Sequence, residues 1–238
     1  MIVKKVIKDI FKKKGYEIIK PTLRNNHFLR RMMLFKANKI NKVLDVGANI
    51  GQYGKLLREI GYEGKIISFE PLQECYNELV NYIKGDNYWE AYNYALGDFD
   101  GTSSINIAGN KDSSSLLEML PSHIKHRPNS KYIGKEKIEI HKLDSIFNDL
   151  FNDNDNLFLK IDAQGYEYLI LEGAKESLPA IKGIQLEMSL EELYKGEKLM
   201  CEMISYLGNK GFKLMSIEPG AVDNVSGQMF QVDGIFFK

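Results

Sequence analysis

The chain of 238 residues has only two cysteines, the residues whose disulfides stabilise small secreted domains, and it contains no long apolar run. Its two cysteines, Cys75 and Cys201, lie far apart and outside any Cys-x-x-Cys or Cys/His spacing, so neither a disulfide framework nor a zinc finger is indicated. No run of eighteen apolar residues is present for a membrane span, and the N-terminus alternates lysine with isoleucine and valine, unlike a signal peptide. We therefore expect a soluble, cytoplasmic protein with one well-buried core.

The formal net charge of zero conceals an uneven distribution along the chain. Residues 1–42 carry thirteen Lys and Arg against two acids, a net charge of +11, which leaves −11 for residues 43–238. Within residues 1–41, apolar side chains recur at helical spacing between lysines and predict a basic amphipathic helix in an N-terminal extension. These apolar residues are Ile2, Val3, Val6, Ile7, Ile10 and Phe11.

Three interpretations of this extension remain open. Its apolar stripe caps the main domain; or it serves self-association, as in a homodimer, or a substrate lid; or it attaches to an anionic membrane surface. Nucleic acid is not an expected partner, because no recognition module accompanies the basic stretch and the rest of the chain is acidic.

From residue 42 onward, short β-rich runs alternate with helical stretches, which predicts a mostly parallel sheet with helices on both faces. The expected strands are 43–47, 65–70, 90–95, 157–162, 182–188, 212–217 and 229–237, and the expected helices are 51–61, 72–84, 165–177 and 190–210. An insert at about 97–156 separates the third and fourth strands and contains a predicted strand pair at 102–107 and 136–142. Because long loops often bind ligands, we expect the insert to act as a substrate lid.

The first predicted strand runs into a glycine turn and then a helix. Gly47 and Gly51 are not spaced as the GxGxxG of a dinucleotide site, and Asp45 just before them suits an ammonium or loop amides better than a pyrophosphate. The second strand ends at Glu70, where an acid can accept hydrogen bonds from both hydroxyls of a ribose. A ribose, an ammonium and no phosphate describe S-adenosylmethionine.

These two motifs and five further runs, in the same order, resemble the FkbM family of S-adenosylmethionine-dependent methyltransferases. The resemblance covers residues 42–238, and its Lys-Ile-Asp-x-x-Gly-x-Glu run is specific to the family. The matching runs are Val43-Leu44-Asp45-Val46-Gly47-Ala48-Asn49-Ile50-Gly51, Phe69-Glu70-Pro71, Ala95-Leu96-Gly97-Asp98 with Gly101-Thr102, Ser113-Ser114-Ser115-Leu116-Leu117, Leu143-Asp144, Leu159-Lys160-Ile161-Asp162-Ala163-Gln164-Gly165-Tyr166-Glu167 and Gln185-Leu186-Glu187.

The resemblance implies an α/β fold of the class I methyltransferase (Rossmann-like) type, with seven strands and the last one antiparallel. It also implies O-methylation of a hydroxyl, and we expect a sugar of a bacterial surface polysaccharide or of a glycosylated metabolite as the acceptor. A lipid-linked, polyketide or nitrogen acceptor is an alternative. A catalytically silent S-adenosylmethionine-binding partner protein is an alternative of another class.

Two acids end neighbouring strands, Asp162 on the fourth and Glu187 on the fifth. Methylation of an alcohol needs a carboxylate or histidine base, or a metal that lowers the pKa of the hydroxyl. Asp162 and Glu187 are therefore candidates for base, for orienter of the substrate, or for ligands of Mg²⁺. Glu167, at the start of the next helix, is a third catalytic candidate, although it also suits the helix dipole.

The expected ligand contacts fall into two sets. The cofactor set is Asp45, Gly47, Ala48, Asn49, Gly51, Tyr53, Glu70, Pro71, Leu96 and Asp162, and the substrate set is Ser114, Ser115, Gln164, His123 and His126. His123 and His126 belong to a basic cluster in the insert, for which we expect either a solvated loop or contact with a phosphate or an acidic sugar.

Overall fold

The computed structural model describes residues 10–152, 154–223 and 225–238. The chain divides into two units, Met1–Ala37 and Asn38–Lys238. In the first unit, residues 10–13 are helical and helix α2 spans His27–Ala37. Most of the predicted amphipathic helix falls on residues 1–9, which lie outside the described residues.

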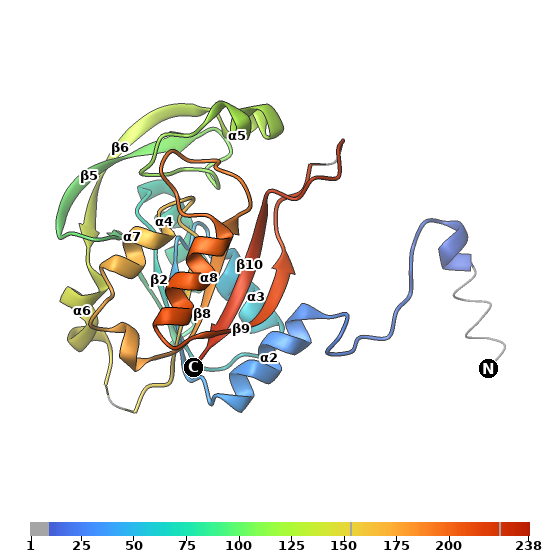
Figure 1. Cartoon of the computed structure of the whole chain (residues 1–238). Helices are drawn as coiled ribbons and strands as arrows, with labels where there is room; N and C mark the ends of the chain where they lie inside the picture. The colour runs from blue at the N-terminus through green and yellow to red at the C-terminus, as the bar shows by residue number, and fades with distance from the viewer. Residues whose placement is uncertain (1–9, 153, 224) are drawn as a thin grey trace. The chain divides into compact units, whose positions relative to one another are not determined.

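The second unit is built on a seven-stranded sheet with the strand order β3-β2-β1-β7-β8-β10-β9 (Figure 1). Strand β10 is antiparallel to both of its neighbours, and the other neighbouring pairs are parallel. This confirms the predicted sheet and its antiparallel last strand. The strands are β1 (Lys42–Val46), β2 (Lys65–Phe69), β3 (Trp89–Tyr92), β7 (Leu157–Ile161), β8 (Ile181–Ser189), β9 (Lys213–Pro219) and β10 (Gln231–Phe237).

Helices cover both faces of this sheet (Figure 1). Every residue of β1 and β7 is buried, as expected for central strands of a parallel sheet, and both strands contribute apolar side chains to the main core. The helices are α3 (Gln52–Glu59), α4 (Gln73–Ile83), α6 (Leu143–Leu150), α7 (Glu167–Glu172) and α8 (Met200–Asn209), of which α6 was not predicted.

A second sheet, with the order β4-β6-β5, joins the insert to the residues just before it, so the predicted strand 90–95 is divided between the two sheets. Its strands are β4 (Ala95–Leu96), β5 (Gly101–Ala108) and β6 (Tyr132–His141). The predicted strand pair is confirmed as β5 and β6, which are antiparallel, with β6 beginning earlier than expected. Helix α5 (Pro121–His126) lies in the connection between β5 and β6.

The predicted helix over 190–210 is wrong in its first half, because residues 190–199 form a loop before α8. Leu190, Leu193 and Tyr194 have helical spacing, but Glu197 accepts hydrogen bonds from the backbone N–H groups of Leu193 and Tyr194. Ser189 donates a further hydrogen bond to the same carboxylate at 2.8 Å. A buried acid therefore stabilises the loop in place of helical hydrogen bonds. Helix α7 is likewise shorter than predicted.

Candidate active site

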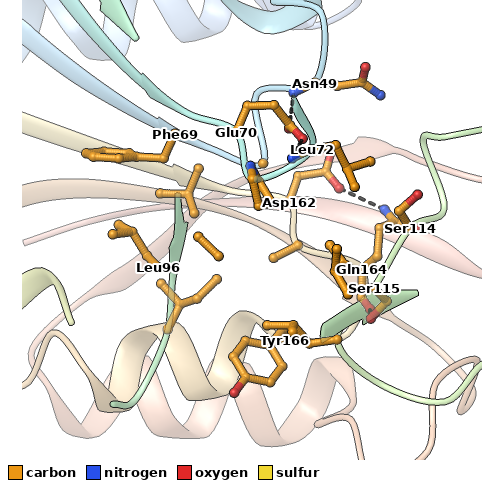
Figure 2. Close-up of a pocket in the computed structure, with 18 of the residues that line it drawn as sticks. Asn49, Phe69, Glu70, Leu72, Leu96, Ser114, Ser115, Asp162, Gln164 and Tyr166 are labelled. Atoms are coloured by element: carbon orange, nitrogen blue, oxygen red, sulfur yellow. Dashed lines mark hydrogen bonds between the residues drawn. The ribbon is translucent and has the colours of Figure 1, made fainter. Parts of the chain in front are cut away.

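A cavity lies at the carboxyl ends of β1, β2 and β7, where residues of the insert also line it (Figure 2). Its empty space, counted together with the open mouth, is about 610 Å³. In Figure 2, Phe69 and Leu96 lie on one side of the cavity, and Ser114, Ser115 and Gln164 lie on the other. The apolar lining also includes Leu72, Ile105, Leu116 and Ile170, and the polar lining also includes Asn49, Glu70, Asp112 and Asp162.

The glycine turn brings two strand ends together. Gly47 has a φ of 73°, and a Cβ added to it would collide with the backbone carbonyl oxygen of Asp162, so only glycine lets the end of β1 approach the end of β7. Gly51 has a different role. A Cβ there would lie 2.7 Å from Cδ1 of Leu79, so its missing side chain allows the start of α3 to pack against α4.

Glu70 presents its carboxylate to the polar side of the cavity. Its Oε2 accepts a hydrogen bond from the backbone N–H of Asn49 at 2.7 Å, and its Oε1 accepts one from Leu72 at 2.8 Å (Figure 2). Burial raises the pKa of Glu70 to about 7, although the two backbone amides lower it. Each oxygen keeps a lone pair for a further donor, as two ribose hydroxyls would supply. This carboxylate and the apolar walls beside it have the chemistry that an adenosine group needs.

Asp162 follows β7 and lines the cavity, and its neighbour Gln164 joins it to β8. The Nε2 group of Gln164 donates to Oδ1 of Asp162 and to Oε2 of Glu187, both at 2.8 Å. Gln231 donates to the same Glu187 oxygen at 2.6 Å. Burial and nearby carboxylates, of which Asp162 is the foremost, raise the pKa of Glu187 well above its usual range. Glu187 does not line the cavity, so it supports Gln164 while Asp162 faces the ligand space.

This arrangement does not suit the predicted Mg²⁺ site. The Nε2 atom of Gln164 is a hydrogen-bond donor and lies between the two carboxylates that a shared metal ion would have to bridge. Among the described residues, no group of three or more His, Cys, Asp or Glu side chains is placed to hold a metal ion.

A buried lysine connects the glycine turn to Asp162. The Nζ atom of Lys160 lies 3.2 Å from Oδ1 of Asp45 and 3.6 Å from Oδ2 of Asp162, and it donates to the carbonyl oxygen of Gly47 at 3.5 Å. Asp45 is fully buried, and burial raises its pKa despite the lysine beside it. The sequence predicts a ligand ammonium or loop amides as the partner of Asp45; in the structure its side chain is enclosed within the sheet, and its partner is the ammonium group of Lys160.

Glu167 holds the loop after β7. Its Oε1 accepts hydrogen bonds from the backbone N–H groups of Ala163 at 2.8 Å and Gly165 at 3.3 Å. Burial raises the pKa of Glu167 to about 8. It does not line the cavity, so the structure gives the predicted catalytic residue a place in the scaffold of the loop.

The insert is tied to both sides of the cavity. The Nδ2 group of Asn49 donates to Oδ1 of Asp112 at 2.7 Å, and the hydroxyl of Ser115 donates to the backbone carbonyl of Gln164 at 2.7 Å. The hydroxyl of Tyr194 donates to Oε1 of Gln164 at 2.8 Å, which leaves Nε2 of Gln164 directed toward the carboxylates.

The structure brings together most, but not all, of the residues expected at the site. Those that line the cavity are Gly47, Asn49, Glu70, Pro71, Leu96, Ser114, Ser115, Asp162 and Gln164. Those that do not are Asp45, Ala48, Gly51, Tyr53, Glu167, Glu187, His123 and His126. Tyr53 instead donates a hydrogen bond to Oε1 of Gln185 at 3.1 Å.

The histidines of the insert are not in a solvated loop. His123 is 2% exposed on α5, and its ring meets that of Tyr194 edge to face. Burial lowers the pKa of His123 to about 4, so the ring is neutral near pH 7 and does not suit the predicted contact with a phosphate. His126 packs against Phe230 with ring centroids 4.1 Å apart.

Sequence reasoning missed Lys160, Asp112 and Tyr194 as parts of the site. A lysine within an otherwise apolar, central strand is a signal that could have identified Lys160, because such a position needs a buried counter-charge. Asp112 and Tyr194 reach the site through loops, and no spacing in the sequence indicates this.

A seven-stranded sheet of this order, with a ligand cavity at the ends of its central strands, is the class I methyltransferase architecture. Residues 45–214 match the model of the methyltransferase FkbM domain. The match covers more than half of the chain, and the chain belongs to this family. It is therefore a methyltransferase, and the family implies S-adenosylmethionine as the methyl donor.

Solved structures with a similar fold share little sequence with the chain. The METTL16 methyltransferase domain is 10% identical, with 98% of this chain and 76% of that chain covered and a TM-score of 0.48. Human methyltransferase 10 domain containing protein is 10% identical (99% and 95% covered, TM-score 0.45). Precorrin-6y C5,15-methyltransferase from Geobacter metallireducens is 12% identical (93% and 93% covered, TM-score 0.45). No relative was found among the curated proteins compared with the chain.

None of the described helices has the length and apolar composition that a membrane span needs.

Proposed function

We propose that the protein is an O-methyltransferase that methylates a hydroxyl of a sugar. The observation that carries this proposal is the carboxylate of Asp162, which lines the cavity and is held on one oxygen by Gln164 and approached on the other by Lys160. An oriented carboxylate can accept the hydrogen bond, and then the proton, of an alcohol. Residues 42–238 form the catalytic domain in this proposal, and the insert at 97–156 is its lid.

The cavity residues divide the work of holding S-adenosylmethionine. Glu70 accepts hydrogen bonds from the ribose, the turn at Gly47 and Asn49 admits the ligand close to the backbone, and apolar side chains such as Leu72 and Leu96 enclose the adenine. When bound, the cofactor supplies a methyl group activated by a positively charged sulfur. The protein therefore has to align an acceptor oxygen and help to remove its proton.

Three neighbouring side chains prepare Asp162 for that task. Gln164 fixes the direction of the carboxylate, and Glu187 holds Gln164 in turn. Lys160 places a buried positive charge 3.6 Å from Asp162, which favours negative charge on oxygen atoms nearby. Because Nε2 of Gln164 lies between Asp162 and Glu187, we propose that the two acids act without a shared metal ion.

The acceptor class follows from the side chains around Asp162. Ser114, Ser115 and Gln164 line the cavity together with Asp162, and their hydroxyl and carboxamide groups can exchange hydrogen bonds with the hydroxyls of a sugar. Family resemblance points to sugars of surface polysaccharides or glycosylated metabolites. These two observations support a sugar over a nitrogen acceptor.

A methyl-transfer screen tests the proposal. Purified protein with radiolabelled S-adenosylmethionine is offered nucleotide sugars, polysaccharide fragments, lipid-linked sugars, polyketide alcohols and amines, and Asp162→Asn is the matched variant. Label on a sugar hydroxyl that disappears in the variant would support the proposal. Label confined to amines would contradict it. Cofactor binding without label on any acceptor would favour a silent binding protein.

A further inference from the structure

The first unit exposes an aromatic pair that a folded protein would ordinarily bury. Phe11 is 44% exposed and Tyr16 is 65% exposed, and their rings meet edge to face with centroids 6.3 Å apart. Gly15, with a φ of 81°, turns the chain back so that the backbone N–H of Tyr16 donates to the carbonyl of Phe11 at 3.0 Å. The turn therefore presents two aromatic rings side by side.

Cations and further apolar side chains surround this pair. Lys12, Lys13 and Lys14 lie between the two rings in the chain and are exposed. Ile18 and Ile19 follow, with 40% and 54% of their surfaces exposed. All residues from 10 to 25 are exposed. They belong to residues 1–42, which have a net charge of +11.

We propose that residues 10–19, the basic aromatic segment, bind the surface of a membrane that contains anionic lipids. Aromatic rings prefer the boundary between headgroups and acyl chains, and isoleucine gains by leaving water. Lysines beside them are attracted to the negative surface potential and reach it with flexible side chains. The segment therefore combines apolar side chains that can enter the membrane interface with cations that are attracted to anionic headgroups.

The same features disfavour two other occupants. A nucleic acid would use the lysines but gains nothing from exposed isoleucines, and residues 43–238, at −11, would repel its phosphates. A second copy of the chain would attract the lysines through the net charge of −11 on residues 43–238, but it would also have to supply an apolar patch for the aromatic pair.

Vesicle cosedimentation of the full chain tests the proposal. The probes are phosphatidylcholine vesicles with and without phosphatidylglycerol, and we expect binding only to the anionic vesicles, decreasing with salt. Each lysine near such a surface contributes roughly a fivefold gain, so the triple variant Lys12→Gln, Lys13→Gln, Lys14→Gln should bind about a hundredfold more weakly. The double variant Phe11→Ser, Tyr16→Ser should bind about tenfold more weakly.

The matched control removes the same charge from exposed positions of the second unit, Lys84→Gln, Lys182→Gln and Lys213→Gln, and should bind like the wild type. Equal loss in the control, no binding to anionic vesicles, or binding that survives both segment variants would overturn the proposal. Two other results would also overturn it. One is tighter binding to RNA than to vesicles, unchanged when Phe11 and Tyr16 are replaced. The other is self-association of the protein without vesicles, seen as a higher molecular mass that the triple lysine variant abolishes. The test needs no methyl acceptor, so its failure leaves the proposed function standing.

Discussion

The Nε2 atom of Gln164 lies 2.8 Å from Oδ1 of Asp162, and the same atom lies 2.8 Å from Oε2 of Glu187. One neutral amide thus holds two acids that would otherwise repel each other at the ends of β7 and β8. Its oxygen accepts the hydroxyl of Tyr194, so the amide cannot reverse without losing hydrogen bonds at both ends. Asp162 owes its orientation in the cavity to this contact.

Replacement of Gln164 by leucine should destabilise the protein. The substitution removes one hydrogen bond each from Asp162, Glu187 and the Tyr194 hydroxyl, and the loss of three hydrogen bonds costs about 2–4 kcal/mol in total. Urea denaturation measures the loss. Gln52→Leu, at an exposed position, is the control and should change the free energy of unfolding by less than about 0.5 kcal/mol. Equal stability of Gln164→Leu and the control would mean that the network is not the support described here.

Asp162→Asn should separate catalysis from cofactor binding. The amide keeps the size of the side chain but cannot take a proton, so turnover of a sugar acceptor should fall roughly 10²- to 10⁴-fold. The affinity for S-adenosylhomocysteine, measured by calorimetry, should stay within a few-fold of the wild type. Full turnover in the variant would remove Asp162 from the mechanism.

Lys160→Met should lower the free energy of unfolding, because Asp45 is buried beside Lys160. Loss of the ammonium leaves an uncompensated buried charge, which costs about 3–5 kcal/mol. Without Lys160 the native pKa of Asp45 rises further above its unfolded value of 3.8, so the variant should lose stability as pH rises above that value.

The double variant Lys160→Met, Asp45→Asn tests the origin of that loss. It should recover stability relative to Lys160→Met and lose the added dependence on pH, as thermal melts across the pH range would show. A double variant as unstable as the single one would indicate that Lys160 acts through packing and not through Asp45.

Binding of S-adenosylhomocysteine should strengthen as pH rises through about 7, where Glu70 loses its proton. Protonation of Glu70 removes an acceptor for the ribose hydroxyls. The affinity for S-adenosylhomocysteine should therefore be low below this pH and reach its full value above it. The unliganded protein should show the opposite trend. Because the pKa of Glu70 is higher in the folded state, the free energy of unfolding should fall as the pH rises from 4.5 to about 7.

Glu70→Gln is the control for that titration. It should bind roughly ten- to a hundredfold more weakly above pH 7, because a bond to a charged acceptor contributes about 1.5–3 kcal/mol, and its affinity should lose the dependence on pH. An unchanged pH profile in Glu70→Gln would assign the titration to another group.

Asp112→Ala should speed release of the cofactor product. The bond from Asn49 to Asp112 ties the insert to the glycine turn, and an exposed hydrogen bond of this kind is worth about two- to tenfold in rate. Stopped-flow dissociation of S-adenosylhomocysteine measures the effect. Asp149→Ala on α6 is the control and should dissociate at the wild-type rate. Equal rates in all three proteins would show that the bond between Asn49 and Asp112 does not hold the insert over the bound ligand.

The sheet could be predicted from the sequence because its signals are local. Apolar runs such as 43–47 and 157–162 are bounded by turn residues and have the composition of buried strands. Glu70 and Asp162 could be placed at the site for the same reason, since strand ends of a parallel sheet meet at one edge. The loop at 190–199 could not be predicted, because its apolar residues have helical spacing while the buried carboxylate of Glu197 binds its backbone N–H groups.

The side-chain network around Asp162 could not be predicted, because its partners come from separate elements. Lys160 pairs with Asp45 across neighbouring strands, and Tyr194 reaches Gln164 from a loop thirty residues away. The burial of His123 depends on the same loop packing over α5. Such contacts require the tertiary arrangement and leave no periodic signal in the sequence.

The most direct test of the account is a crystal structure of the protein with S-adenosylhomocysteine. We expect the ribose hydroxyls on the carboxylate of Glu70, the adenine among the apolar side chains around Leu96, and the sulfur on the side of the cavity that Asp162 faces. A nucleoside bound elsewhere, or one whose ribose makes no contact with Glu70, would contradict the assignment of this cavity as the active site.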